Sequence, residues 1–155
     1  MTDETRTRGE SMSAGGDSAP ALHLVLRNEN EELCRAARLL EDFLTAHGAG
    51  PDGMFACQLI IEEVLTNVVK YAHDDGSLHE ILFDTELKGE HIVLRITDDG
   101  REFNPLTVPL PDPDLPLEER PIGRLGIHLV RNFADRVEYA RTRDCNVLTI
   151  FVRRF

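Results

Sequence analysis

Three polar side chains share one side of a helix that the sequence predicts over residues 51–73. Glu63, Asn67 and Lys70 are spaced i, i+4 and i+7, so they lie on the same helix face. An asparagine oxygen is a hard, neutral ligand suited to Mg²⁺, which takes few protein ligands and relies on phosphate oxygens for the rest. A carboxylate one turn away can accept the proton of an attacking hydroxyl group. The spacing indicates a helix face that carries a metal ligand and a general base. The alternative is a helix face that is simply exposed to solvent.

A second segment is suited to a nucleobase. Asp98-Asp-Gly100 follows a predicted strand and continues to Phe103-Asn104-Pro105. A carboxylate at that place can accept a hydrogen bond from an exocyclic amine, and a glycine lets the backbone approach closely. Acidic turns of this kind are also common after strands that bind nothing.

A third segment is suited to an anion. Gly123-Arg-Leu-Gly126 comes immediately before a predicted helix. Glycines there let backbone N–H groups point at an anion, and the positive end of the helix dipole adds to the attraction. Alone the motif is weak, because it is also an ordinary helix start. Taken together in chain order, however, the three segments describe one site. It would have a metal ligand, a loop that recognises a nucleobase and a helix start that binds phosphate.

The elements that must position this site segregate along the chain. Predicted strands cover 22–27, 79–87, 91–97, 136–141 and 147–153, and predicted helices run from Asn28 or Asn30 to about His47, over 51–73 and over 125–134. Because hairpins join the strands, we expect an α+β fold, a two-layer sandwich with helices on one face of a mixed, mainly antiparallel sheet. Residues 1–21, rich in Thr, Ser, Gly, Asp and Glu, are expected to form a disordered tail.

One long segment interrupts this pattern. Residues 98–121 hold six of the eight prolines and show little periodicity, so we expect a long loop. Loops of that length inside a compact domain are uncommon and are usually functional or disordered.

Composition excludes several classes of protein. The 155 residues predict a single domain, and a net charge of −11 disfavours direct binding to DNA or RNA. No apolar run approaches the roughly 18 residues of a membrane span, and the N-terminus lacks the apolar region of a secretory signal. We therefore expect a cytoplasmic protein without a membrane partner. The three cysteines and six histidines show no metal-ligand spacing, which favours reduced structural thiols and surface or core histidines.

As a set, the three segments resemble the N, G1 and G2 boxes of the ATPase fold shared by gyrase, Hsp90, histidine kinases and MutL. They are most similar to its short single-domain branch, the anti-sigma factor serine/threonine kinases. In that branch a Glu precedes the Asn by four residues, as Glu63 precedes Asn67, and the G1 box resembles the stretch from Asp98 to Pro105. The likeness extends through Gly126-Ile-His-Leu-Val-Arg and covers nearly all of residues 22–155, which implies one Bergerat-type, histidine kinase-like ATPase domain.

The resemblance implies a role for each matching residue. Glu63 would be the general base for a substrate serine, Asn67 would ligate Mg²⁺, and Asp98 would bind the adenine amine. Residues 104–122 would form the ATP lid. The nucleotide contacts that it implies are Asn67, Lys70, Asp98, Gly100, Phe103, Arg120, Gly123, Arg124, Leu125, Gly126 and Asn146.

Two positions depart from the family pattern. Glu102 stands where larger members carry a second G1 glycine, which the short branch often lacks too, so we expect ATP binding to survive and the carboxylate to alter lid closure. The late threonine that helps to hold adenine aligns with Asn146 or, less well, with Thr149.

The implied function is that of an ATP- and Mg²⁺-dependent protein serine/threonine kinase that regulates transcription. It would bind a sigma factor and phosphorylate an anti-anti-sigma antagonist of the STAS type. The resemblance also allows a homodimer, because members of the family commonly form dimers. One alternative is a non-catalytic, nucleotide-gated protein-binding switch. Another is the detached catalytic domain of a histidine kinase, which needs a phosphoacceptor hairpin for which 155 residues leave no room.

Overall fold

The computed structural model describes residues 10–13, 18–109, 112–119 and 124–155. The strands are β1 (Glu10–Ser13), β2 (Ala21–Arg27), β3 (Glu80–Lys88), β4 (His91–Asp98), β5 (Arg136–Thr142) and β6 (Cys145–Arg153). The helices are α1 (Asn30–Ala46), α2 (Pro51–Tyr71) and α3 (Arg124–Phe133), with the short 3-10 turns η1 (Pro105–Thr107) and η2 (Leu117–Glu119).

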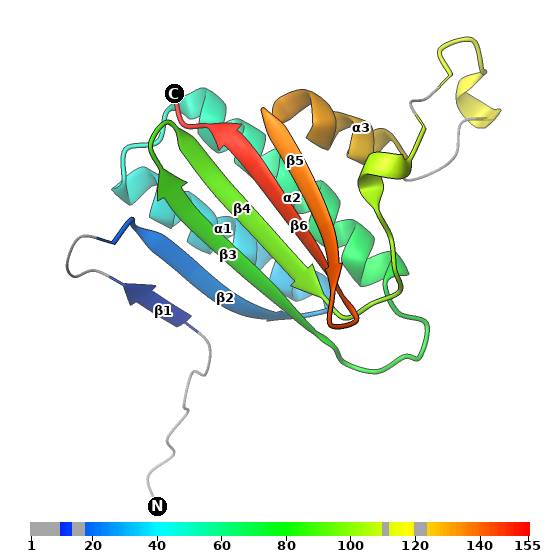
Figure 1. Ribbon diagram of the computed structural model, residues 1–155, viewed down its shortest axis with the longest axis horizontal. Helices are drawn as coiled ribbons and strands as arrows, with labels where there is room; N and C mark the ends of the chain where they lie inside the picture. Colours follow the sequence, from blue (N-terminus) through cyan, green and yellow to red (C-terminus); the bar gives the residue numbers. More distant parts are fainter. Residues whose placement is uncertain (1–9, 14–17, 110–111, 120–123) are drawn as a thin grey trace, which may run out of the picture.

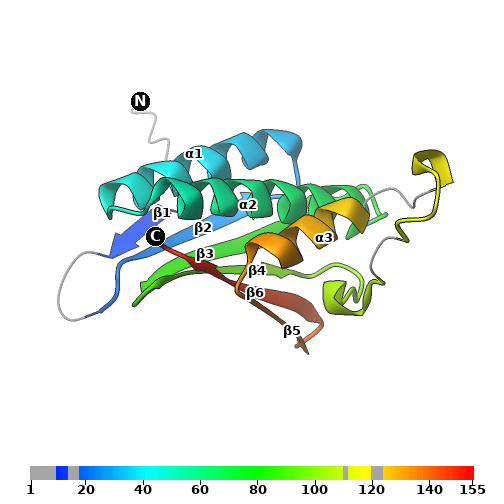
Figure 2. The same ribbon diagram turned by 90° about the horizontal axis from the view of Figure 1, so that it is seen from above.

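The molecule has two layers, with the three α-helices on one face of the sheet (Figures 1 and 2). The strand order is β1-β2-β3-β4-β6-β5. The α+β sandwich is therefore confirmed. Every pairing among the described strands is antiparallel, so the sheet is more uniform than the mixed sheet that we expected. The reason is that β6 lies between β4 and β5 and is antiparallel to both. β4 and β5, which run in the same direction, are therefore not paired with each other.

The core lies between the layers and follows the predicted periodicities. In the sequence, the apolar residues Cys57, Ile61, Val64 and Val68 of α2 recur at helical spacing and predict one buried stripe. Cys57 and Ile61 are buried as expected, and Leu65 continues the stripe. Val64 and Val68, which we also expected in the core, are only partly buried. They line a cavity instead, so the apolar side of α2 serves both the core and a site.

The start of α2 is held tightly against the end of β6. A Cβ atom added to Gly53 would lie 2.5 Å from the carbonyl oxygen of Arg153, and the Gly50 N–H donates a 2.8 Å hydrogen bond to the Arg154 carbonyl. Only a glycine allows this approach, because both neighbours are backbone atoms.

Two local expectations differ from the structure. Part of the segment expected to be a disordered tail, Glu10–Ser13, forms β1 and pairs with β2, because an edge strand offers unpaired backbone groups. The sequence offered Asn28 or Asn30 as the N-cap of α1, and this prediction is wrong, because the N-cap is Glu29 and makes no side-chain cap bond. Asn28 instead accepts a 2.8 Å hydrogen bond from the His79 N–H, which ties the end of β2 to the start of β3.

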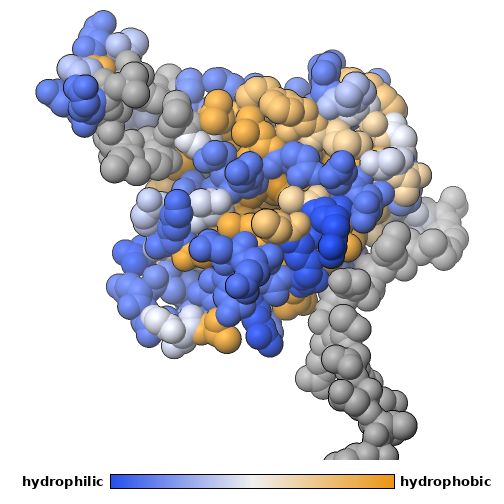
Figure 3. Space-filling view, turned by 180° about the vertical axis from the view of Figure 1, so that it is seen from behind, coloured by the Kyte–Doolittle hydropathy of each residue, from blue (hydrophilic) through white to orange (hydrophobic). Residues whose placement is uncertain are grey.

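The surface on the helix side carries apolar as well as hydrophilic residues, as the view from behind shows (Figure 3). Phe55 of α2 and Phe133 of α3 are both exposed and meet edge to face, with ring centroids 5.9 Å apart. In the part of the chain that the structure describes, no helix combines the length and hydropathy needed to cross a membrane.

Candidate nucleotide-binding site

A cavity of about 530 Å³ lies between α2, α3 and the loop that follows β4. Its walls include the apolar side chains Val64, Val68, Ile96, Ile127, Val130 and Leu148. Polar groups are few, and among them are Asn67, Asp98 and Asn146. A mostly apolar hollow with a few convergent polar groups is the usual form of a small-molecule site.

Asp98 lies at the end of β4 and is only 6% exposed. Its Oδ1 accepts hydrogen bonds from the Gly100 N–H at 2.9 Å and from the Asn146 amide at 3.0 Å. No described residue donates to its Oδ2, which leaves this atom available to a ligand donor. The structure therefore presents Asp98 as a fixed hydrogen-bond acceptor in the cavity wall.

Asn146 holds the loop after β4 in place. Its amide nitrogen also donates to the Arg101 carbonyl at 2.8 Å, and its oxygen accepts from the Phe103 N–H at 3.2 Å and from the Tyr139 hydroxyl at 2.7 Å. Thr149 lies on the other side of the sheet, because the side chains of β6 alternate and Asn146 shares its face with Leu148. Of the two positions left open by the sequence, only Asn146 lines the cavity.

Gly100 is a glycine for a reason that the sequence did not reveal. A Cβ atom added there would lie 2.5 Å from the Cβ and 2.7 Å from the carbonyl oxygen of Ala72, just after α2. The Arg101 N–H then donates to the same carbonyl at 3.0 Å, and Arg141 donates to the Gly100 carbonyl at 2.8 Å. The loop is therefore packed directly on the end of α2.

The Glu63 carboxylate lies against the first turn of α3. A Cβ atom added to Gly126, which is buried, would lie 2.1 Å from Glu63 Oε2 and 3.0 Å from its Cδ. The missing side chain therefore admits the carboxylate to a helix start, where the dipole favours negative charge. Asn67, one turn further along α2, lines the cavity. Glu63 and Gly126 do not themselves line the cavity as the described residues form it, but Glu63 lies one turn before Asn67 and contacts the start of α3.

The remaining predicted residues divide into three groups. Phe103 lines the cavity and is 48% exposed, whereas Lys70 is exposed and lies outside the cavity wall as the described residues form it. Arg124 and Leu125 begin α3. Arg120 and Gly123 lie outside the described residues.

Sequence reasoning missed four polar residues of the cavity wall, namely Tyr71, Arg101, Arg131 and Tyr139. Arg131 donates to the Val108 carbonyl at 3.2 Å and so ties α3 to the loop after η1. Helical spacing offered a signal for this residue, because Arg131 lies four positions after the buried Ile127. The spacing along β5 offered none for Tyr139.

Comparison with known proteins identifies the class to which this fold and site belong. Residues 26–152 match the histidine kinase-like ATPase domain family, and the chain belongs to that family. Membership implies that the domain binds ATP.

Among solved structures, the chain is similar to the RsbU and RsbW domains of Rv1364c from Mycobacterium tuberculosis, with a TM-score of 0.62 and 15% sequence identity. The match covers 86% of this chain and 32% of that one, so the chain spans about a third of that neighbour's length. At this identity the likeness supports the fold. A search of curated protein sequences found no significant match.

Proposed function

We propose that the chain is an ATP-dependent protein serine/threonine kinase in which Glu63 acts as the general base. The observation that carries the proposal is the position of the Glu63 carboxylate at the Gly126 turn of α3, one helical turn from Asn67 on α2. A proton acceptor and an oxygen ligand then lie one turn apart on α2, with the acceptor against a helix start, and phosphoryl transfer requires positioning of this kind.

In this proposal the nucleotide lies along α2. Its adenine amine donates to Asp98 and its phosphates lie at the start of α3, where backbone N–H groups bind an anion well. Asn67 fits Mg²⁺ because it offers one neutral oxygen and leaves the other positions to phosphate and water. The metal supplies charge neutralisation across the phosphates.

The transfer step needs few protein groups. The oxygen of a substrate serine attacks the γ-phosphorus while the bond from that phosphorus to the β–γ bridging oxygen breaks. Glu63 receives the serine proton, and ADP leaves. The enzyme contributes mainly position and electrostatics, because the covalent chemistry belongs to ATP.

The proposed partners are a sigma factor and its STAS-type antagonist, which carries the accepting serine. This part of the proposal rests on the resemblance of the three motif segments to the anti-sigma kinase branch. The fold similarity to a protein that contains an RsbW domain agrees with it.

The test is a transfer assay with γ-labelled ATP and a candidate antagonist. We expect label on a serine of the antagonist, and we expect Glu63→Gln to abolish it while ATP affinity stays the same. Glu62→Gln is the matched control, because Glu62 is the exposed neighbour on the same helix. Tight ATP binding without transfer to any antagonist would contradict the kinase.

One observation favours the nucleotide-gated switch as a second candidate. The segment with η1 forms part of the cavity wall, and Arg131 ties its end to α3. A bound nucleotide would therefore contact the segment and order a partner surface. For a switch, Glu63→Gln leaves ATP-dependent partner binding unchanged and there is no transfer to lose.

A further inference from the structure

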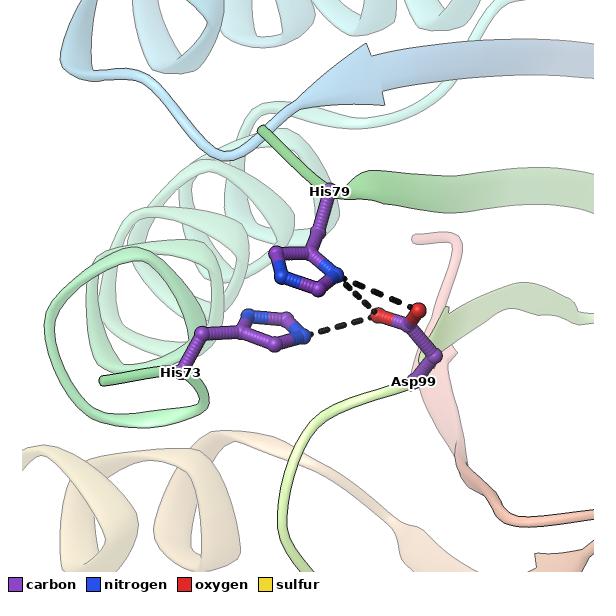
Figure 4. A group of neighbouring side chains, drawn as sticks. All are labelled: His73, His79 and Asp99. Carbon is purple, nitrogen blue, oxygen red and sulfur yellow. Dashed lines mark hydrogen bonds and ion pairs between the residues drawn. The ribbon is translucent and has the colours of Figure 1, made fainter. Parts of the chain in front are cut away.

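Two histidines and an aspartate from three different parts of the chain meet beside the loop after β4 (Figure 4). His73 follows α2, His79 precedes β3 and Asp99 follows β4. The Nε2 atom of His73 lies 2.8 Å from Asp99 Oδ1, and Nδ1 of His79 lies 3.2 Å from the same oxygen. One potential ligand atom from each residue lies within 4.8 Å of the other two.

We propose that His73, His79 and Asp99 bind a divalent transition metal of the zinc class. The ligands would be Nε2 of His73, Nδ1 of His79 and one carboxylate oxygen of Asp99. Two imidazoles and one carboxylate suit zinc and its first-row neighbours, whereas magnesium prefers oxygen ligands alone. This site is separate from the proposed Mg²⁺ position at Asn67.

The second nitrogen of His79 supports this assignment. Its Nε2 is bound by Asp75 Oδ2 at 2.8 Å, and Asp75 is itself held by the Ser77 N–H at 3.0 Å. A metal-binding histidine characteristically gives its other ring nitrogen to a carboxylate, which fixes the tautomer and the ring orientation. Asp75 therefore leaves Nδ1 of His79 directed at Asp99, as Figure 4 shows.

Burial holds the two rings in place. The side chains of His73 and His79 are only 10% and 19% exposed, and the rings stack with centroids 3.5 Å apart. The buried Nδ1 of His73 has no hydrogen-bond partner among the described residues. Nε2, facing Asp99, is therefore the atom through which this ring interacts. Asp99 is 52% exposed, which gives an ion access and leaves room for a water ligand.

A small rearrangement accommodates the ion. With zinc–ligand distances of about 2.0–2.1 Å, neighbouring ligand atoms in a tetrahedral site lie roughly 3.3 Å apart. The His73–Asp99 pair must then open by about half an ångström, and the parallel rings must tilt so that both nitrogens face one point. All three residues lie at the ends of elements, where such adjustments are small, and the exposed Asp99 side chain can take most of the movement.

The test is a zinc titration of the full chain, carried out in a Cys34→Ser background because Cys34 is exposed and can bind zinc. We expect one equivalent to bind. His79→Gln should abolish the binding, and Asp75→Asn should weaken it by about 10- to 100-fold because it removes the outer carboxylate. His91→Gln is the matched control, because His91 forms a similar pair with Asp135 elsewhere on the surface. Absent binding, or equal binding by the His79 variant, would overturn the proposal.

A second measurement on this Cys34→Ser background avoids the risk that the His79 variant fails to fold. Imidazole NMR signals are followed as zinc is added. Changes at His73 and His79 without changes at His91 support the site. Changes at His23 or His91 alone, or none at all, overturn it.

Discussion

The carboxylate of Glu63 occupies the space in which a side chain at position 126 would begin, and Gly126 leaves that space free. The overlap distance, 2.1 Å from Oε2 to an added Cβ atom, is too short for both groups to remain. The position of the proposed base is therefore set from the opposite helix. The identity of residue 126 thus bears on chemistry as well as on backbone shape.

Gly126→Ala should displace the Glu63 carboxylate from the start of α3. We expect phosphoryl transfer to fall by about 100-fold, because a misplacement of roughly 1 Å has that effect on a reacting group. ATP affinity should fall less than transfer does, since Asp98 still holds the adenine end in the proposed binding mode. Asn132→Ala, at an exposed position of the same helix, is the control and should retain transfer. Equal rates for the two variants would contradict this view of Gly126.

Asn146→Ala should weaken nucleotide binding and lower stability. It removes the donor to Asp98 and the acceptor for the Phe103 N–H, and a buried group left without its partner costs about 1–3 kcal/mol. Isothermal titration with ATP and urea unfolding measure the two effects. Thr149→Ala, on the opposite face of β6, should leave ATP affinity unchanged. A loss of ATP affinity in the Thr149 variant instead would mean that Thr149, and not Asn146, faces the nucleotide.

Gly53→Ala should destabilise the fold without touching the cavity. The added carbon would lie 2.5 Å from the Arg153 carbonyl and 2.9 Å from that of Arg154, so backbone must move. Overpacking of this kind costs about 1–3 kcal/mol. Thermal unfolding measures it, with Asp52→Ala as a neighbour at an exposed position. A variant as stable as the wild type would mean that α2 and β6 can separate at little cost.

Asp135 should contribute stability that disappears in acid. Hydrogen bonding from His91, with Arg153 beside it, lowers the pKa of this carboxyl below its ordinary value. A carboxyl whose pKa is lower in the folded state stabilises above its unfolded pKa of about 3.9, and the effect is lost as the pH falls through the folded value. The melting temperature of Asp135→Asn should therefore lie below that of the wild type at pH 6 and approach it as the pH falls below 4. A gap that stays constant down to pH 2 would contradict this.

The cysteines should differ sharply in reactivity. Burial raises the pKa of the Cys57 thiol to about 12, so that it is protonated as well as inaccessible at pH 8. Cys34 is exposed and should react first with a disulfide reagent. Mass spectrometry of the labelled chain locates each modification, and Cys57 should be labelled only after unfolding. Rapid labelling of Cys57 in the native protein would argue against its burial in the core.

Local patterns in the sequence predicted the three α-helices and five of the six strands that the structure describes, and they selected several of the residues that line the cavity. The 3.6-residue period identified Cys57 and Ile61, because a helix turns its faces by a fixed angle per residue. The same period placed Lys70 with Asn67, yet the cavity lies on the other side of Asn67, toward Tyr71. Spacing defines a face of a helix, but the packing of other elements decides which sector of that face borders a hollow.

Contacts between distant segments could not be predicted in this way. His73, His79 and Asp99 come together only because α2 and β4 end, and β3 begins, at the same corner of the molecule (Figure 4). The role of Asn146 as a link to both Asp98 and Phe103 depends likewise on the pairing of β4 with β6. Such relationships follow from strand register, which the spacing within one segment does not contain.

Both ends of α2 are packed against the sheet or its loops, so this helix sets a fixed distance between the groups along it. At one end Gly53 packs against the backbone at the end of β6, and at the other end Ala72 packs against Gly100. Between Asn67 and Ala72 the helix advances about 7.5 Å, at 1.5 Å per residue. That interval cannot stretch, so in the proposed binding mode a ligand whose base and phosphates are too close together or too far apart would engage only one end. The backbone would then select a nucleotide by its length, in addition to any selection by the identity of its base.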